Sequence, residues 1–323
     1  MKRKRQRLAL AQDRFVFFCM GCRASTILCS DTHDQNRRIQ DDLVALLARV
    51  EKTASFYDPE SELNRLPHGR CVPVSDDLLK LLLLSRKMHE KTQEAFDITL
   101  GNLKALFDRA RRGGARPTTE EIRLAFEAAG MEKVEIRDGC VEIRDATVRL
   151  DLSGIAKGYG VDKAVALARA YGAKGALVNV GGDLRVFGVQ EEPARSEWEI
   201  EIQDPRPGRR TLGRVFLRDS AIATSGDYGR SAATGDRILG HIFRPNAMGE
   251  PATESLVSVT VETPTCAEAD ALATAVFALG LEKGLACLKG NFPQVAYLLV
   301  TRRNDTLEFH GNLKALGLPN KDV

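Results

Sequence analysis

Two segments of the chain space their apolar residues as amphipathic helices do. In residues 37–55 the apolar positions recur at intervals of three and four and share one face: Ile39, Leu43, Leu46, Leu47 and Val50. Residues 75–92 repeat this pattern, and Ser75 or Asp76 supplies the N-terminal cap. The spacing predicts a helix over each segment, with its apolar face against a core.

A third helix is predicted between residues 118 and 130. Thr118 and Glu121 have the spacing of a capping box, in which each residue satisfies a backbone amide at the helix start. Gly130 marks the end, because glycine readily adopts the left-handed conformation that terminates helices. The preceding residues 108–119 are rich in arginine, glycine and proline, so they are the most linker-like part of the chain.

Strands are predicted from residue 131 onward. Residues 133–154 contain short β-rich runs with a turn at residues 138–139, and a helix over 159–172 and a strand over 175–188 follow. Further strands are predicted over 197–205 and 214–225, and residues 14–30 predict a strand interrupted at Gly21. This order predicts an α+β fold, a single large domain with mixed or antiparallel sheets flanked by helices.

The helix predicted over residues 265–280 carries two polar residues in a small and apolar sequence. Thr265 and Glu268 form a second capping box, and Gly280 is the expected stop. Asp270 and Thr274 are four residues apart and share a face. They are either an exposed stripe, with Thr274 bonded back to carbonyl 270, or oxygen ligands in a buried helix. In the second case the carboxylate needs a cation, and such oxygens suit Mg²⁺.

Residues 149–164, RLDLSGIAKGYGVDKA, are a second candidate. A predicted strand leads through a turn with Gly154 and Gly158 into a helix, whose first amides together with Lys157 favour phosphate. The Walker spacing is absent, and an ordinary strand-to-helix connection explains the glycines equally well. Three further candidates have structural explanations too: the glycine pair 181–182, the polar turn 225–227, and His241 before a turn-rich loop.

Composition places the chain in the soluble globular class. Of its 323 residues, 43% are hydrophobic and 28% are charged, and the net charge of +3 is too small to indicate nucleic acid as a partner. No run approaches the roughly 20 apolar residues of a membrane span. Residues 1–14 are predicted to be a flexible basic tail, because Asp13 and Arg14 interrupt any signal-peptide core. We expect a cytoplasmic protein, with a periplasmic or membrane-associated one as the alternative if the start is misassigned.

Cysteine usage supports that expectation. The seven cysteines are odd in number and scattered, which fits a reducing compartment and buried, inert thiols. The sequence CMGC at residues 19–22 has the spacing of zinc or redox sites, but a structural zinc needs four ligands. Cys29 is the only further thiol nearby, and it lies in an apolar run.

A series of short motifs follows in one order along the chain: CMGC, FYDPESELNRL, AFDITLGNL, LDLSGIAKGYGVD, VGGDL, IATSGDY, HI with a later proline and glycine, and ADALAT. In this order and over about residues 17–290, they resemble the ApbE family, the FAD:protein FMN transferases. The resemblance implies binding of FAD and Mg²⁺ and transfer of FMN to a threonine or serine of an acceptor protein, with release of AMP. The domain then spans residues 15–323, and the acceptor carries the pattern D-x-x-[ST]-G-A-[ST].

The resemblance also implies roles for individual residues. The FAD site is expected to include Met20, Tyr57, Ala95, Phe96, Asp97, Asp151, Lys157 and Ile242. Gly154, Asp270 and Thr274 are the expected Mg²⁺ ligands, with glycine contributing its backbone carbonyl. His241 is the expected catalytic histidine, and it or the metal-linked Asp270 would accept the proton of the acceptor hydroxyl.

Two departures from the family pattern leave other functions open. Arg244 stands where many relatives have an acidic residue, and Cys22 replaces a threonine in the first motif. The alternatives are an FAD pyrophosphatase that gives FMN and AMP, and a protein that binds or stores FAD without turnover. No residue pattern decides the oligomeric state, so a homodimer is left open.

Overall fold

The structure is a computed structural model that describes residues 10–190, 197–206, 208, 210–226, 232–234, 237–239, 256–303 and 306–318. It begins with a hairpin of β1 (Ala11–Cys19) and β2 (Cys22–Ser30). Met20 and Gly21 form its two-residue turn with φ of 50° and 69°, which explains the predicted interruption at Gly21. Residues 11–14 therefore belong to β1 and not to the basic tail, whose residues 1–9 lie outside the described part.

The central sheet has eight strands in the order β1-β2-β6-β7-β10-β13-β14-β15, and each neighbouring pair is antiparallel. Its later strands are β6 (Gly175–Val180), β7 (Asp183–Gly188), β10 (Ala221–Gly226), β13 (Leu256–Thr263), β14 (Ala296–Arg303) and β15 (Thr306–Gly311). The prediction of an α+β domain with antiparallel strands is confirmed.

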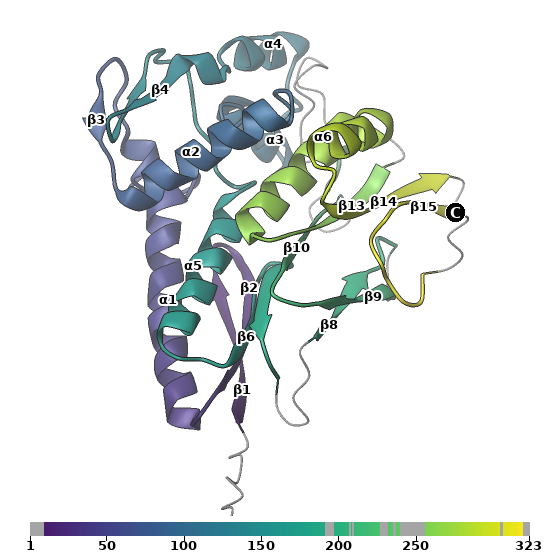
Figure 1. Cartoon of the computed structure of the whole chain (residues 1–323). Coiled ribbons are helices and arrows are strands. Elements are labelled where there is room, and N and C mark those ends of the chain that lie inside the picture. The colour runs from purple at the N-terminus through teal and green to yellow at the C-terminus, as the bar shows by residue number, and fades with distance from the viewer. Residues whose placement is uncertain are drawn as a thin grey trace, which may run out of the picture.

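Three helices pack on one face of this sheet: α1 (His33–Ala54), α5 (Ala156–Ala170) and α6 (Cys266–Asn291). Figure 1 shows α1 and α5 beside the first strands and α6 over β10 and β13. The five apolar residues predicted for the buried face of α1 are all inside the core. The apolar spacing of residues 37–55 thus fixes how this helix lies on the sheet.

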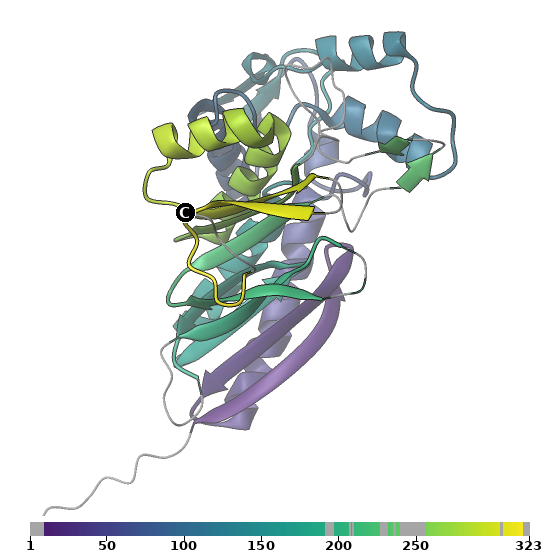
Figure 2. The same cartoon turned by 90° about the vertical axis from the view of Figure 1, so that its right-hand side faces the viewer.

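The opposite face is covered by a two-stranded ribbon of β8 (Trp198–Gln203) and β9 (Thr211–Leu217). Alternate residues of β8, beginning with Trp198, are buried in a second core with Leu184, Ile222 and Leu298 of the central sheet. Residues of the ribbon and of the sheet line a cavity on this side of the molecule. Figure 2 shows the sheet with the purple hairpin of β1 and β2 at one end and the yellow β15 at the other.

The remaining elements form a helical region beyond one end of the sheet. They are α2 (Asp76–Lys91), α3 (Gly101–Arg111), α4 (Thr119–Glu127), β3 (Val72–Pro73), β4 (Val134–Arg137), β5 (Cys140–Ile143), β11 (Ala232–Thr234) and β12 (Arg237–Leu239), with short 3-10 turns at Leu63–Arg65 and Met131–Lys133. Ser75 caps α2, and Thr118 with Glu121 forms the predicted capping box of α4. Helix α3 includes residues 108–111, which the sequence assigned to a linker.

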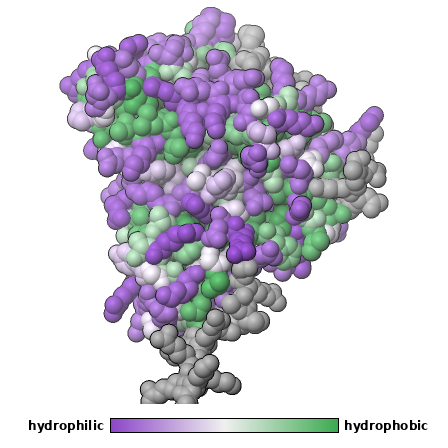
Figure 3. All heavy atoms as spheres, viewed as in Figure 1, coloured by the Kyte–Doolittle hydropathy of each residue, from purple (hydrophilic) through white to green (hydrophobic). Residues whose placement is uncertain are grey.

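Helix α6 is the most apolar of the described α-helices. It is the one described helix long and apolar enough to cross a membrane, and 61% of its apolar window is buried inside the protein. The expectation that no segment is apolar enough to cross a membrane is therefore wrong. Most of this window is buried inside the protein, as in the core helix of a globular domain. Gly280 is non-helical, with a φ of 76°, and divides α6 into two helical segments across a kink, so the first segment ends where the sequence predicted. The face of the molecule seen in Figure 3 is mostly hydrophilic, with smaller hydrophobic areas.

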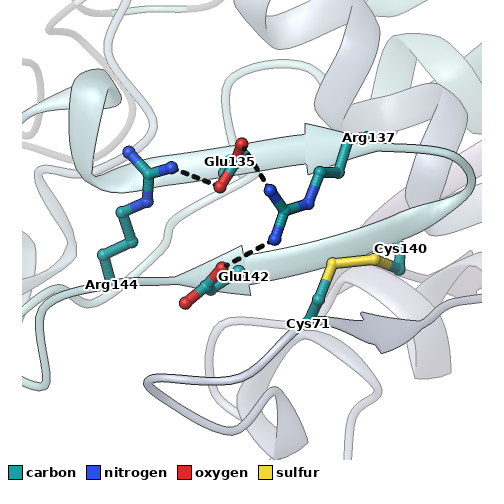
Figure 4. The surroundings of a disulfide bond; sticks show 6 residues. All are labelled: Cys71, Glu135, Arg137, Cys140, Glu142 and Arg144. Atoms are coloured by element: carbon teal, nitrogen blue, oxygen red, sulfur yellow. Dashed lines mark hydrogen bonds and ion pairs between the residues drawn. A yellow bond between two sulfur atoms is a disulfide. The ribbon is translucent and has the colours of Figure 1, made fainter.

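A disulfide bond joins Cys71, directly before β3, to Cys140 of β5 (Figure 4). The hairpin of β4 and β5 also has ion pairs, in which Arg137 contacts Glu135 and Glu142, and Arg144 contacts Glu135. The prediction that all cysteines are inert thiols is wrong for these two. They are 69 residues apart in sequence, and only the pairing of β3 with β5 brings them together.

The disulfide predicts a thiol count. Unfolded protein without reductant should show five reactive thiols, rising to seven after reduction. Cys140→Ser should lower the free energy of unfolding by about 2–4 kcal/mol, because the long loop is no longer closed in the unfolded state. Alkylation with mass spectrometry and chemical denaturation measure both effects. Seven thiols before reduction, or a wild-type stability that does not respond to reductant, would contradict the assignment.

Candidate active site

A cavity with a volume of about 880 Å³ lies where the sheet, the β8–β9 ribbon and the starts of two helices meet. Its walls come from β2, β6, β7, β8 and β10, from residues 95–104 and 151–157, and from α6. The polar residues of the wall include Arg14, Asp97, Lys104, Asp151, Ser153, Lys157, Asn179, Asp183, Thr224, Ser225, Asp270 and Thr274. Segments from the whole length of the chain thus contribute polar groups to one cavity.

The strongest charge interaction in this wall is a lysine between two buried carboxylates. Lys157 Nζ lies 2.8 Å from Asp183 Oδ2 and 3.1 Å from Asp270 Oδ2. Both aspartates are only 4% exposed. Lys157 also donates to the carbonyl of Ser153 at 3.3 Å. The buried carboxylate that the sequence singled out at residue 270 therefore has a cation partner within the chain.

Gly158 is what allows α5 and α6 to approach closely enough for this ion pair. A Cβ atom at Gly158 would lie 2.3 Å from the carbonyl oxygen of Cys266, so only glycine fits there. The amide of Gly158 donates to Asp270 Oδ2 at 3.1 Å. The glycine thus fixes the crossing of the two helices (Figure 1) and supplies a hydrogen bond to the carboxylate.

The start of α6 is held by Asp162 of α5. Its two carboxylate oxygens accept hydrogen bonds from the amides of Cys266 and Ala267, each at 2.9 Å, and Arg185 pairs with it at 2.7 Å. Burial raises the pKa of Asp162, although these partners oppose the rise. Thr265 is the N-cap residue but makes no capping hydrogen bond, so the second predicted capping box is wrong. Asp162, which lies 104 residues before Cys266 and on another helix, accepts the hydrogen bonds of these amides instead.

The hydroxyl of Thr274 lies between Asp270 and Ser225 of β10. It donates to the carbonyl of Asp270 at 2.9 Å and lies 3.4 Å from Ser225 Oγ. A Cβ atom at Gly154 would lie 3.3 Å from Thr274 Oγ1, so the 154 backbone is adjacent. Thr274 is therefore bonded back to carbonyl 270, and oxygen atoms are also clustered around it. The sequence offered these as alternatives, and both are present.

These oxygens match the kind of ligand that Mg²⁺ takes. They are a carboxylate, two hydroxyls and nearby backbone carbonyls on Asp270, Thr274, Ser225 and Gly154. In the described part of the chain, no three His, Cys, Asp or Glu side chains form a metal cluster. A cation in this cavity would therefore depend on hydroxyl and carbonyl oxygens as well as on carboxylates.

A second charged group lines the cavity beside residues 95–97. Lys104 is 7% exposed, and its Nζ lies 3.9 Å from Asp151 Oδ2. Asp151 also accepts hydrogen bonds from the amide and hydroxyl of Ser153. Asp97 accepts from the amide and hydroxyl of Thr99. Both aspartates are thus fixed by short-range turns, while their segments face the cavity.

The structure brings most of the sequence-predicted residues together but not all of them. Eight of them line the cavity: Ala95, Phe96, Asp97, Asp151, Gly154, Lys157, Asp270 and Thr274. Met20 packs against the core and donates its amide to Glu51. Tyr57 is 57% exposed and donates to Asp108, with its ring 5.4 Å from Lys104 Nζ. His241 and Ile242 lie outside the described residues.

The CMGC turn reaches this site through Gly181. With φ of 67°, Gly181 lies so close to Cys22 that a Cβ atom would be 2.9 Å from the sulfur. Burial raises the pKa of the Cys19 thiol to about 12, with contributions from Cys22 and Glu51. At neutral pH this thiol is protonated and therefore a poor ligand or nucleophile.

Comparison with known proteins shows the family of this chain. A model of the ApbE family matches residues 20–299. The chain belongs to the ApbE family. A Vibrio cholerae relative named FAD:protein FMN transferase is 31% identical, covering 84% of this chain and 81% of its own length. A Treponema pallidum relative of the same name is 32% identical, covering 80% and 76%.

Solved ApbE structures have the same fold. The flavin transferase ApbE from Vibrio cholerae superposes with a TM-score of 0.82 at 28% identity, over 94% of this chain and 97% of its own. The apo flavinyl transferase ApbE from Pseudomonas stutzeri gives 0.83 at 27% identity, over 95% and 96%. The single large domain inferred from the sequence is thus the ApbE fold.

Two cavity residues of this ApbE chain escaped the sequence interpretation. Asp183 begins β7 directly after the glycine pair at 181–182, and a charged residue between apolar neighbours was the available signal. Lys104 lies in the middle of α3, where a lysine ordinarily faces solvent. Its burial depends on Asp151 and on the rings of Phe56 and Tyr57, which are contacts between distant segments.

Asp162→Ala should destabilise the protein strongly. It would leave two helix amides and Arg185 buried without their acceptor, which we expect to lower the free energy of unfolding by about 3 kcal/mol. Chemical denaturation measures the change. Glu127→Ala is the control, since its pair with Arg123 is exposed and should change stability by no more than about 0.5 kcal/mol. Equal effects of the two substitutions would contradict the role of Asp162.

Proposed function

We propose that the protein is a Mg²⁺-dependent FAD:protein FMN transferase. It takes FAD as substrate and attaches FMN to an acceptor flavoprotein, as the names of its ApbE relatives describe. The observation that carries the proposal is the polar wall around Asp270, where a lysine, carboxylates and hydroxyls converge on one cavity. Such a wall suits the pyrophosphate of FAD and a divalent cation.

The proposed cation ligands are Asp270, Thr274 and the carbonyl of Gly154. They fit Mg²⁺ because they are oxygen donors, and because a second buried carboxylate, Asp183, is paired with Lys157 beside them. Bound there, Mg²⁺ would supply charge neutralisation on the pyrophosphate oxygens. Lys157 would hold a phosphate oxygen in place through its positive charge.

The rest of the cavity is proposed to hold the flavin and adenosine parts. Its volume of about 880 Å³ is within the usual range for sites of this kind, about 300–1,000 Å³. Residues 95–97 and Asp151 form one wall, and apolar side chains of β2, β6 and β10 form another. Lys104 brings a second positive charge to this wall, next to Asp151.

The reaction moves one phosphoryl group. The oxygen of an acceptor threonine or serine hydroxyl bonds to the FMN phosphorus, and the bond from that phosphorus to the bridging oxygen breaks. AMP leaves with the bridging oxygen, and the hydroxyl proton passes to a base. Positioning and charge neutralisation are the main requirements of such a transfer, and the rigid α5–α6 crossing provides both.

We further propose which acceptor the enzyme modifies. The acceptor is a separate protein with the pattern D-x-x-[ST]-G-A-[ST]. That the enzyme forms a homodimer stays a prediction.

We also propose that the protein works in an oxidising compartment. The disulfide between Cys71 and Cys140 supports this, because such bonds persist in oxidising compartments and are rare in reducing ones. It therefore favours the periplasmic alternative over the cytoplasmic expectation.

Asp270→Asn should slow AMP release from FAD by at least about 100-fold. The substitution removes the charge of a group that is both a proposed cation ligand and a partner of Lys157. The measurement is AMP formation with FAD, Mg²⁺ and acceptor. The control is Asp77→Asn, which removes a carboxylate paired with Lys163 outside the cavity and should leave activity within about twofold. Wild-type AMP formation by Asp270→Asn would remove the proposed cation site.

His241 is the proposed base, with Asp270 as the alternative. We expect His241→Ala to slow FMN transfer by about 100-fold or more, while the affinity for FAD changes little, since general-base catalysis contributes on this scale. Flavin fluorescence titration and acceptor mass together measure the two effects. Loss of FAD binding in this variant would instead make His241 a binding residue.

A further inference from the structure

One lysine in the cavity wall serves two buried carboxylates that come from different elements. Lys157 lies on α5, Asp183 at the start of β7, and Asp270 on α6. The ammonium is 2.8 Å from Asp183, and 3.2 and 3.1 Å from the two oxygens of Asp270. Its own side chain is 15% exposed, so all three groups are largely removed from water.

Asp183 is placed by the tight turn between β6 and β7. The turn residues Gly181 and Gly182 have φ of 67° and 103°, and the amide of Gly182 donates to Asn179 Oδ1. Val180 and Asp183 are directly paired across the hairpin. The backbone therefore holds Asp183 at the cavity wall independently of Lys157.

The proposed function makes conflicting demands on Asp270. In this structure both of its oxygens contact the ammonium of Lys157, whereas cation binding needs the same oxygens. A cation at Asp270 also repels the ammonium. If Asp270 were its one carboxylate partner, Lys157 would lose its counter-charge inside the protein, which is strongly unfavourable.

We propose that Asp183 is the positioning residue that holds Lys157 when Asp270 binds the cation. It keeps a negative charge 2.8 Å from the ammonium, so that Asp270 can turn to the metal while Lys157 stays beside the phosphate. Asp183 touches neither the substrate nor the metal and acts through Lys157. This inference rests on the proposed cation site at Asp270.

The test is Mn²⁺ binding by Asp183→Asn in the absence of FAD, measured from the electron paramagnetic resonance signal of free Mn²⁺. The substitution keeps the shape of the side chain but removes its charge, so Lys157 is held more strongly by Asp270. We expect the dissociation constant for Mn²⁺ to rise at least about tenfold. Asp77→Asn is the matched control, because it also uncouples an aspartate from a lysine but outside the cavity.

A second readout separates positioning from damage to the fold. In FAD turnover, the Mg²⁺ concentration for half-maximal rate should rise by a similar factor, while the rate at saturating Mg²⁺ returns to within about threefold of wild type. An unchanged Mn²⁺ affinity, or a lower rate that Mg²⁺ does not restore, would overturn the role of Asp183. A wild-type protein whose Mn²⁺ binding is the same as that of Asp270→Asn would overturn the cation site itself, and this proposal with it.

Discussion

The close crossing of α5 and α6 is the constraint on which the site depends. At Gly158 the two backbones approach so closely that no side chain fits against the Cys266 carbonyl. This contact places Lys157 beside Asp270, which lies one turn beyond Cys266 on α6. Asp162 of α5 also accepts hydrogen bonds from the first amides of α6, so α5 helps to hold the start of that helix.

The sheet completes the site from its other elements. Strand β7 contributes Asp183 and β10 contributes Ser225, each at the strand end that faces the helix crossing. Charges that are costly to bury are thereby satisfied in pairs at the wall of a cavity. The same arrangement stabilises the fold and prepares the cavity for a cation and a phosphate group.

Local sequence signals predicted the described α-helices except α3, which no predicted helix covered. Apolar spacing located α1 and α2, and the capping box at Thr118 located α4, because these patterns depend on neighbours within a few residues. Asp270, Thr274 and Lys157 were also found from local context, since polar groups in apolar or glycine-rich segments are unusual. The order of the short motifs then identified the ApbE family.

Features that depend on distant segments could not be predicted in this way. The second capping box had the right letters, yet Asp162 from another helix satisfies the amides in place of Thr265. Cys71 and Cys140 are joined through a strand pairing that spacing does not reveal. The charge balance of Lys157 likewise depends on Asp183, which only the fold brings within contact.

The most direct test of the account is the stoichiometry of one reaction of the wild-type protein. The protein would be incubated with FAD, Mg²⁺ and an acceptor that carries the D-x-x-T-G-A-T pattern, with a chelator in a parallel sample. Chromatography would quantify AMP, and mass spectrometry would quantify FMN on the acceptor. A Mg²⁺-dependent FMN transferase should give equal amounts of AMP and acceptor-bound FMN, and neither product with the chelator. AMP with free FMN and an unmodified acceptor, or bound FAD without any AMP, would contradict it.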